Sequence, residues 1–122
     1  MRWSHDAKDQ LTTLAFDGGE LIVPHLDAPI GQRVRARVKA RDVSLSIRRP
    51  TEISILNVLR AHVTAIDEET GPIVDLQLAI GTSSLVARIT RRSFEQLGIR
   101  KGQELYALVK AVSFDQRSVG YA

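Results

Sequence analysis

The sequence predicts an all-β protein built from small barrel-like units with one short helix. Short segments in which apolar and polar residues alternate run along most of the chain, and turns rich in glycine or proline separate them. A ten-residue segment in the first half also has a similar counterpart in the second half, which indicates two related units. The chain has 122 residues, of which 43% are hydrophobic, so it suits one globular domain or two very small ones.

Alternation and turn residues define the strands expected in the first half. Asp17-Gly18-Gly19 predicts a tight turn, because glycine accepts the positive φ that such turns require. Residues 24–31 contain two prolines and a glycine and are predicted to be a loop. Between residues 33 and 41, basic side chains alternate with valine and alanine, which is typical of a half-buried strand. Strands are therefore expected at residues 11–16, 21–23, 33–41 and 42–47.

The second half is expected to contain longer strands and the helix. Residues 73–80 alternate strictly, so Val74, Leu76, Leu78 and Ile80 should face the core. Residues 90–97 are predicted to be helical, with Thr90 as the N-cap and Gly98 as the end. The expected strands lie within residues 53–66 and at residues 73–80, 84–89 and 103–114.

The internal repeat gives the domain organisation. Residues 31–40 align with residues 102–111, and six of the ten positions are identical. About nine short strands in two related units predict OB-fold-like barrels, in which residues 24–31 of the abbreviated first unit stand where the second has its helix. The expected boundaries are a polar leader or linker at 1–10, a first unit at 11–50, a second, complete unit at 51–115 and a tail at 116–122.

Composition and motifs argue against an enzyme. The chain has no cysteine, so disulfides and thiolate chemistry are excluded. His5, His25 and His62 are isolated and lack metal-ligand spacing. There is no phosphate-binding loop and no nucleophile elbow, and no apolar run is long enough for a signal peptide or a membrane span. We therefore expect a cytoplasmic, non-enzymatic protein.

The net charge of +3 is concentrated in residues 33–49, which hold seven basic residues and one acidic residue. A nucleic-acid groove is one interpretation of this basic strand, and a solvated outer face is the other. Barrels that bind single strands also need aromatic stacking platforms. Because no aromatic residue lies between Phe16 and Phe94, we favour the solvated face and expect no nucleic-acid partner.

Two further features have a functional and a structural interpretation. Thr90, two arginines and Ser93 begin the expected helix, where an anion can bind, although Thr90 can equally be a simple cap. Lys110 lies late in an apolar strand, and Lys39 occupies the matching place in the first unit. These lysines can serve an anion or simply end the buried segment.

Together, four segments in this order resemble the molybdate-binding MOP/TOBE (molbindin-like) domain: residues 53–59, 87–93, 97–98 and 106–113. They are most similar to the C-terminal regulatory part of the ATP-binding subunit of the bacterial molybdate ABC importer. The similarity covers about residues 11–115. It implies a regulatory and dimerisation domain whose barrels bind molybdate or tungstate at subunit interfaces, without catalysis by this part.

The resemblance also implies a ligand set and partners. It implies that the oxyanion is bound by these residues: Ser54, Asn57, Thr90, Ser93, Lys110 and the backbone of Ala111. The implied partners are a second copy of the chain, an ATPase domain of the same polypeptide and the importer's membrane subunits, at the cytoplasmic face of the inner membrane. Leu56 stands where the motif often has arginine, which removes a multi-donor cation. A ligand-free dimerisation domain is therefore the alternative.

Overall fold

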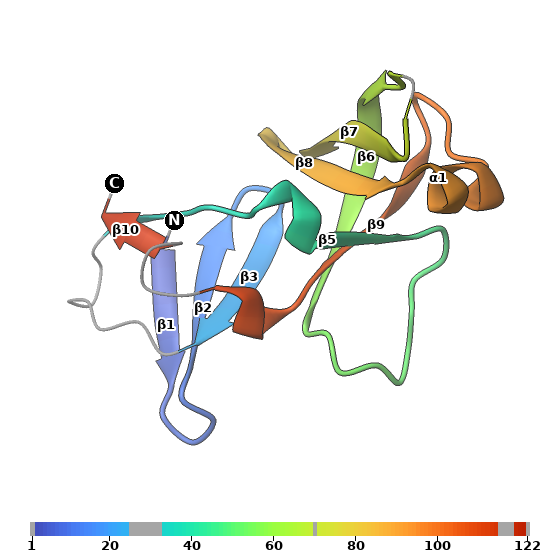
Figure 1. Cartoon of the computed structure of the whole chain (residues 1–122). Helices are drawn as coiled ribbons and strands as arrows, with labels where there is room; N and C mark the ends of the chain where they lie inside the picture. Colours follow the sequence, from blue (N-terminus) through green and yellow to red (C-terminus); the bar gives the residue numbers. More distant parts are fainter. Residues whose placement is uncertain (1, 25–32, 70, 115–118, 122) are drawn as a thin grey trace.

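The chain forms two small β structures joined side by side, with an α-helix at one end (Figure 1). The computed structural model describes residues 2–24, 33–69, 71–114 and 119–121. The predicted all-β class with one short helix is confirmed. The elements are β1 (Arg2–Asp6), β2 (Leu11–Phe16), β3 (Gly19–Pro24), β4 (Val34–Ala36), η1 (Ala40–Asp42), β5 (Val43–Ser46), β6 (Asn57–Asp67), β7 (Ile73–Ile80), β8 (Ser83–Thr90), α1 (Arg91–Leu97), β9 (Glu104–Val109), η2 (Ala111–Ser113) and β10 (Val119–Tyr121).

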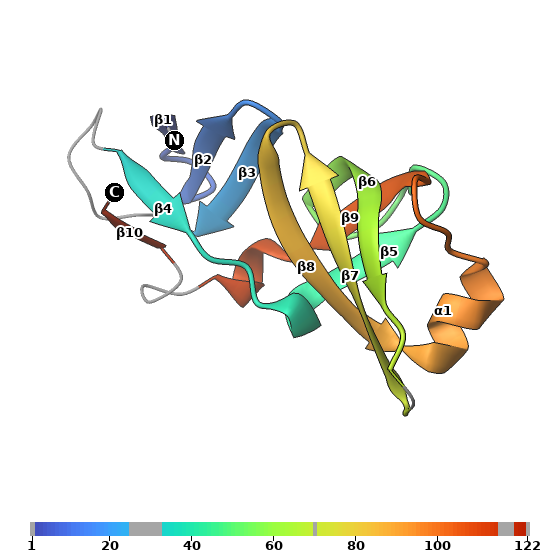
Figure 2. The same ribbon diagram turned by 90° about the horizontal axis from the view of Figure 1, so that it is seen from above.

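The larger of the two structures is a curled, five-stranded antiparallel sheet. Its strand order is β5-β9-β6-β7-β8, and its outer strands β5 and β8 contact each other, so the sheet curls round a core (Figure 2). The alternation predicted for β7 is confirmed, because its inward residues are at most 2% exposed: Val74, Leu76, Leu78 and Ile80. Burial of these branched side chains on one face is what fixes the register of the sheet.

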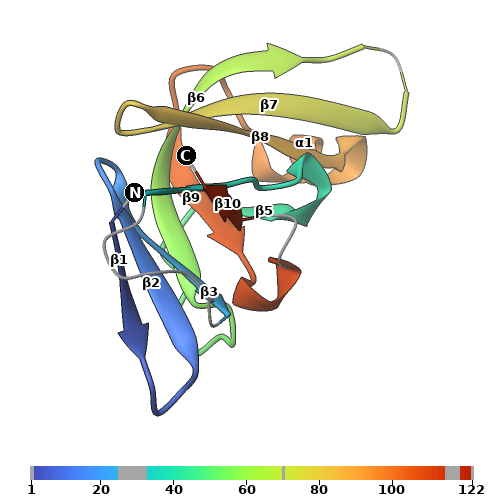
Figure 3. The same cartoon turned by 90° about the vertical axis from the view of Figure 1, so that its left-hand side faces the viewer.

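The smaller structure consists of the meander β1-β2-β3 and the separate pair β10-β4. The strand that follows each 3₁₀ turn pairs with a strand of the other repeat. β5 follows η1 of the first repeat but pairs with β9 of the second, and β10 follows η2 of the second repeat but pairs with β4 of the first. Figure 3 shows the meander β1-β2-β3 as a separate group of strands beside the larger sheet, and Figure 2 shows β10 next to β4 although it comes last in the chain. The two halves are therefore interlocked by an exchange of strands, and the predicted boundary between units near residue 50 stays a prediction.

The two 3₁₀ turns reproduce the sequence repeat in three dimensions. Lys39 and Lys110 precede them with almost the same backbone angles, φ −70° and ψ 136° against φ −65° and ψ 132°. In each turn the lysine carbonyl accepts a hydrogen bond from the N–H three residues later, at 2.9 Å from Asp42 and 3.0 Å from Ser113. The turns also occupy reciprocal places, with η1 against β8 and η2 against β3. The repeated sequence thus encodes a repeated strand-and-turn unit.

Four expectations need correction. The predicted leader contains β1, which pairs with β2 along its whole length, and the predicted tail contains β10. Hydrophobic periodicity missed both strands because backbone pairing, not an apolar pattern, places them. The strand expected at 33–41 is regular only over Val34–Ala36, and the strand expected at 103–114 ends at Val109, because the lysine-containing turns interrupt both. The loop expected at 24–31 lies, after Pro24, outside the described residues.

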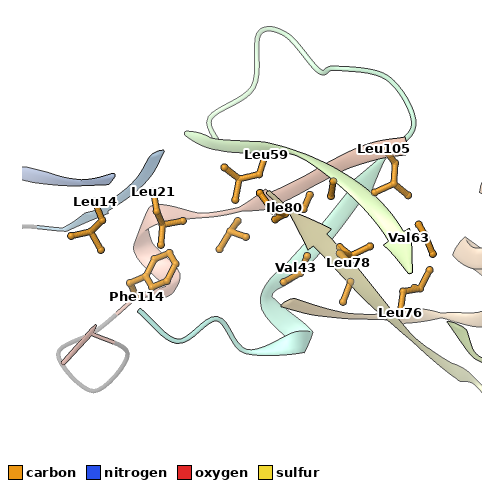
Figure 4. Close-up of a cluster of buried hydrophobic side chains, with 14 of the residues drawn as sticks. Leu14, Leu21, Val43, Leu59, Val63, Leu76, Leu78, Ile80, Leu105 and Phe114 are labelled. Carbon is orange, nitrogen blue, oxygen red and sulfur yellow. The ribbon is translucent and has the colours of Figure 1, made fainter. Parts of the chain in front are cut away.

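The halves share one apolar core and meet through their hairpin tips. Figure 4 shows Phe114, which follows η2, beside Leu14 and Leu21 of the first meander. At the tips, the carboxylate of Asp17 accepts hydrogen bonds from the backbone N–H and hydroxyl of Thr82. Gly18 is needed there, because a Cβ at this position would lie 2.5 Å from the carbonyl oxygen of Ile80. The tight turn predicted at Asp17-Gly18 is thus also a contact between the halves.

Candidate functional site

Antiparallel pairing of β6 with β9 gathers one group of the predicted ligands. Asn57 is the Cα partner of Val109, so the start of β6 lies beside the end of β9 and next to Lys110. Ser54, in the segment before β6, is exposed, and Lys110 is exposed as well. Ala111 is buried in the following turn. Four predicted ligands, Ser54, Asn57, Lys110 and Ala111, therefore lie at one end of the larger sheet, which we call the lysine end.

Asn57 has a structural task at the lysine end. Its side chain is 2% exposed, and its carboxamide pairs with the backbone of Ile22 in β3. The Oδ1 atom accepts from the Ile22 N–H at 2.7 Å, and Nδ2 donates to the Ile22 carbonyl at 2.8 Å. Because β3 is the outer strand of its meander, these backbone groups would otherwise lack a strand partner. Asn57 thus positions the segment that carries Ser54, and a solvent-borne ion does not reach it directly.

The turn after β9 offers hydrogen-bond donors beside the lysine. The Lys110 carbonyl accepts from the Ser113 N–H and from its hydroxyl, at 3.0 and 2.7 Å. The N–H of Ala111 has no hydrogen-bond acceptor among the residues described, as is usual for the first N–H groups of a helical turn. A cationic ammonium group and a backbone donor are therefore neighbours.

Exposed apolar side chains flank the lysine end, and periodicity arguments missed them. Val112 is 83% exposed, Leu56 51% and Ile53 44%. Val112 follows the buried Ala111 in a 3₁₀ turn, where strand alternation no longer predicts which way a side chain points. For Leu56 the sequence gives a signal only through the resemblance, because the resembled motif often has arginine there. These three residues make the lysine end a partly apolar surface.

The opposite end carries the remaining predicted ligands. Thr90 is the N-cap of α1, as predicted: its hydroxyl accepts from the Ser93 N–H at 3.1 Å and lies 3.1 Å from the Ser93 hydroxyl. Gly98 ends the helix in the left-handed conformation with φ 62°, also as predicted. The capping interpretation of Thr90 is therefore confirmed, and the Thr90 and Ser93 hydroxyls lie together at what we call the threonine end.

The two arginines at the start of α1 differ in their contacts. The guanidinium of Arg91 donates to the carbonyls of Gly71 and Glu69, and its backbone N–H donates to the Pro72 carbonyl at 2.8 Å. Arg91 therefore fastens the helix to the β6–β7 turn. Arg92 is exposed. Of the two, Arg92 is the one whose charge faces solvent.

A single chain does not bring the two groups of ligands together. The lysine end lies at the start of β6, whereas Thr90 pairs with Ile73 at the start of β7, beyond the far end of β6. β6 has 11 residues and so spans roughly 30 Å. In Figures 1 and 2, α1 lies far from the turn that follows β9. A site that uses both ends requires more than one copy of the chain.

Other candidate residues add no second site. His62 is exposed on β6, whereas the side chain of His5 and all of His25 lie outside the described residues. Among the side chains described, no three histidine or acidic residues are grouped to bind a metal ion. The basic side chains of residues 33–41 are all exposed, in agreement with a solvated face. None of the helices in the described part is long and apolar enough to cross a membrane.

Two solved structures resemble this fold. A molybdate-bound crystal structure of the cytoplasmic molybdate-binding protein ModG aligns with a TM-score of 0.79 and 23% identity, covering 92% of this chain and 84% of that one. This is a likeness of fold. A molybdate-binding protein from Sporomusa ovata aligns with a TM-score of 0.50 and 32% identity, covering 53% of this chain and 96% of its own. Almost the whole of the second protein thus corresponds to about half of this chain.

Curated sequences give the family. Over 110 residues the chain is 46% identical to the molybdenum import ATP-binding protein ModC of Albidiferax ferrireducens and 47% identical to that of Aromatoleum aromaticum. These alignments cover 90% of this chain but only 30% and 29% of the relatives, so the chain spans less than a third of their length. Residues 53–115, just over half of the chain, match the TOBE domain. The chain therefore belongs to the TOBE domain family.

Proposed function

We propose that the chain binds a tetrahedral dianion of the molybdate or tungstate class at a site built between two copies. The observation that carries this proposal is the β6–β9 pairing, which puts Lys110 and Ala111 beside the start of β6, three residues after Ser54, in a chain of the TOBE family. The names of the ModC relatives and of the ModG and Sporomusa ovata proteins add the choice of oxyanion.

The chemistry at the lysine end suits such an ion. A doubly charged oxyanion needs hydrogen-bond donors and at least one cation, and charge-assisted hydrogen bonds are the strong ones. Lys110 supplies the cation, the Ser54 hydroxyl and the Ala111 N–H supply donors, and Asn57 fixes the segment that presents Ser54. Ile53, Leu56 and Val112 are exposed in the single chain. A second copy that covers them would exclude water around the ion and so strengthen its charge interaction with Lys110.

A second copy supplies Thr90 and Ser93. Each end of the sheet also exposes apolar side chains: Leu56 and Val112 at the lysine end, Ile73 and Leu97 at the threonine end. Contact between the lysine end of one copy and the threonine end of another would bury these side chains and bring both ligand groups to one ion. The oligomer is therefore part of the proposal.

In the longer protein, the domain would regulate transport without carrying out catalysis. The relatives are molybdenum import ATP-binding proteins, so an ATPase domain of the same polypeptide and importer membrane subunits are the proposed partners, on the cytoplasmic side. Binding of the ion would tie two copies together when molybdate is plentiful and hold the attached ATPase halves apart.

Titration calorimetry with molybdate, tungstate, sulfate and phosphate tests the site. Saturable heat is expected for molybdate and tungstate, and Lys110→Gln should weaken binding roughly tenfold, the loss expected when one charge-assisted hydrogen bond goes. Lys101→Gln, at another exposed lysine, is the matched control and should change little. Leu56→Arg should tighten binding by adding a planar multi-donor cation.

Two outcomes would contradict the proposal. Absence of heat with all four oxyanions at millimolar concentration would remove the binding function. Tight molybdate binding by a chain that stays monomeric in light scattering would remove the shared site, because one chain keeps its two ligand groups apart.

A ligand-free dimerisation domain is the second candidate, and a specific observation favours it. The polar atoms of Asn57 already pair with Ile22, the Thr90 hydroxyl already caps α1, and Leu56 replaces the arginine. This candidate expects a dimer in light scattering whose melting temperature does not move with molybdate.

A further inference from the structure

The two segments that form the lysine end both rest on one strand of the smaller half. The segment before β6 is held through Asn57, whose carboxamide pairs with the backbone of Ile22 in β3. The turn η2, which begins at Ala111, lies against β3 as well. Phe114, the residue that ends this turn, is 5% exposed and lies beside Leu21 (Figure 4). Two consecutive residues of β3, Leu21 and Ile22, therefore hold both segments.

The turn η2 is a small hydrogen-bonded unit that is fixed at both ends. The Lys110 carbonyl accepts from the Ser113 N–H at 3.0 Å, and the Ala111 carbonyl accepts from the Phe114 N–H at 3.2 Å. On one side the unit continues from β9, whose last residue, Val109, is completely buried. On the other side, within the described part of the chain, the Phe114 ring is what packs into the core. The place of Lys110 and of the Ala111 N–H thus depends on this ring.

The first 3₁₀ turn is held in another way. Val43 ends η1 as Phe114 ends η2, because each donates its N–H to the carbonyl of the alanine that begins its turn. Val43 is already the first residue of β5 and pairs with Val109 in the sheet ladder. Phe114 lies in no strand. A buried aromatic ring, which removes a large apolar area from water, therefore does at η2 what a strand ladder does at η1.

We propose that Phe114 is a positioning residue for the oxyanion site. Packing of its ring on Leu21 keeps η2 against β3 and so holds Lys110 and the Ala111 N–H beside the segment that carries Ser54. The inference rests on the proposed function, and it adds that the smaller half, which supplies none of the proposed ligands, sets the affinity. A turn that is already fixed avoids the cost of ordering its ligand groups when the ion binds.

Titration calorimetry with molybdate tests the positioning. Phe114→Ala should bind roughly tenfold more weakly than the native chain, because ordering of the freed turn then opposes binding. Phe114→Leu keeps a large apolar side chain and should restore most of the affinity. Phe16→Ala is the matched control, since it removes the same ring from a partly buried position of the smaller half, at the hairpin tip, and should change the affinity little.

Two further measurements separate positioning from a loss of stability. Phe114→Ala should cost less affinity in the Lys110→Gln background than in the native chain, because both changes act on one turn. A smaller folded fraction would instead lower the affinity by the same factor in both backgrounds. Without ligand, the Ser113 amide should exchange faster in Phe114→Ala but keep its protection in Phe16→Ala. Circular dichroism checks folding, and Leu21→Ala, which weakens the same contact from β3, replaces Phe114→Ala if that variant does not fold.

Each of three results would overturn the inference. Native molybdate affinity in a folded Phe114→Ala chain would remove it and leave the proposed function standing. Equal losses in Phe114→Ala and Phe16→Ala would mean that any loosening between the halves weakens binding, without a special task for Phe114. Absence of heat in the native chain would remove the proposed function and this inference with it.

Discussion

The two halves of the chain share a strand-and-turn sequence but differ in how well it is covered. Lys39 and Lys110 lead into nearly identical 3₁₀ turns, so this local structure follows the local sequence. Val38 and Val109 are the same residue at the same place in the repeat, yet only Val109 is completely buried. The comparison teaches that sequence sets the backbone of each unit, whereas burial depends on which strands lie beside it.

Polar side chains connect the two halves by hydrogen bonds. Asn57 of the larger half completes the outer edge of β3 in the smaller half with a carboxamide, which has the same donor and acceptor groups as a peptide bond. Asp17 of the smaller half accepts hydrogen bonds from Thr82 of the larger half. The smaller half therefore depends on the larger one for satisfied backbone groups.

The largest effect is expected from Asn57→Ala. The change leaves the N–H and carbonyl of Ile22 without their partner in a partly buried place and should lower the free energy of unfolding by about 3 kcal/mol. Urea denaturation measures the loss. His62→Ala, at an exposed residue of the same strand, is the control and should cost little.

Hydrogen exchange shows where the loss falls. Amides of β2 and β3 should exchange faster in Asn57→Ala, while those of β7 and β8 keep most of their protection. Equal acceleration in all four strands would mean that the halves unfold as one unit. The two halves would then differ in how their side chains are buried but not in their stability.

A matched pair of valine substitutions tests the difference in burial directly. Val109→Ala removes two methyl groups from a fully packed position and should cost about 2 kcal/mol. Val38→Ala makes the same change at a partly buried residue that lines a cavity of about 380 Å³ between the halves and should cost less than about 1 kcal/mol. Urea denaturation of both variants under the same conditions gives the two values, and equal costs would show that the cavity is closed in solution.

Periodicity and capping predicted the regular parts of the fold well. β7, the helix with its Thr90 cap and the turn at Asp17-Gly18 were all expected, because each depends on residues within a few positions of one another. β1 and β10 were missed, because pairing with distant strands positions them. The exchange of β5 and β10 between halves follows from tertiary pairing, which no local pattern contains.

The candidate site divides in the same way. The resemblance selects Ser54, Lys110 and Ala111, and the β6–β9 pairing brings Lys110 and Ala111 to the end of the sheet where the segment with Ser54 enters β6. It also selects Thr90 and Ser93, which lie at the other end of the sheet. The separation between the two groups of ligands has no signal in residue spacing or composition, because it depends on how the strands pair. The engagement of Asn57 with Ile22 joins residues 35 positions apart and had no signal in the sequence.

The smallest effect concerns pH and the hairpin tips. The Thr82 hydroxyl and N–H hold the pKa of Asp17 below its ordinary value, because they bind the charged carboxylate. A carboxyl group whose pKa is depressed on folding contributes stability above its unfolded pKa of about 4 and loses it as the pH falls through the folded value. Asp17→Asn should therefore melt below the native chain at pH 7, and the difference should shrink as the pH drops below about 4. Thr82→Ala removes the hydroxyl but keeps the N–H, so melting curves of this variant should show a weaker dependence on acid. A difference in melting temperature between Asp17→Asn and the native chain that stays constant from pH 7 to pH 3 would contradict this. The close packing at Gly18, and not the charge of Asp17, would then stabilise the contact between the halves.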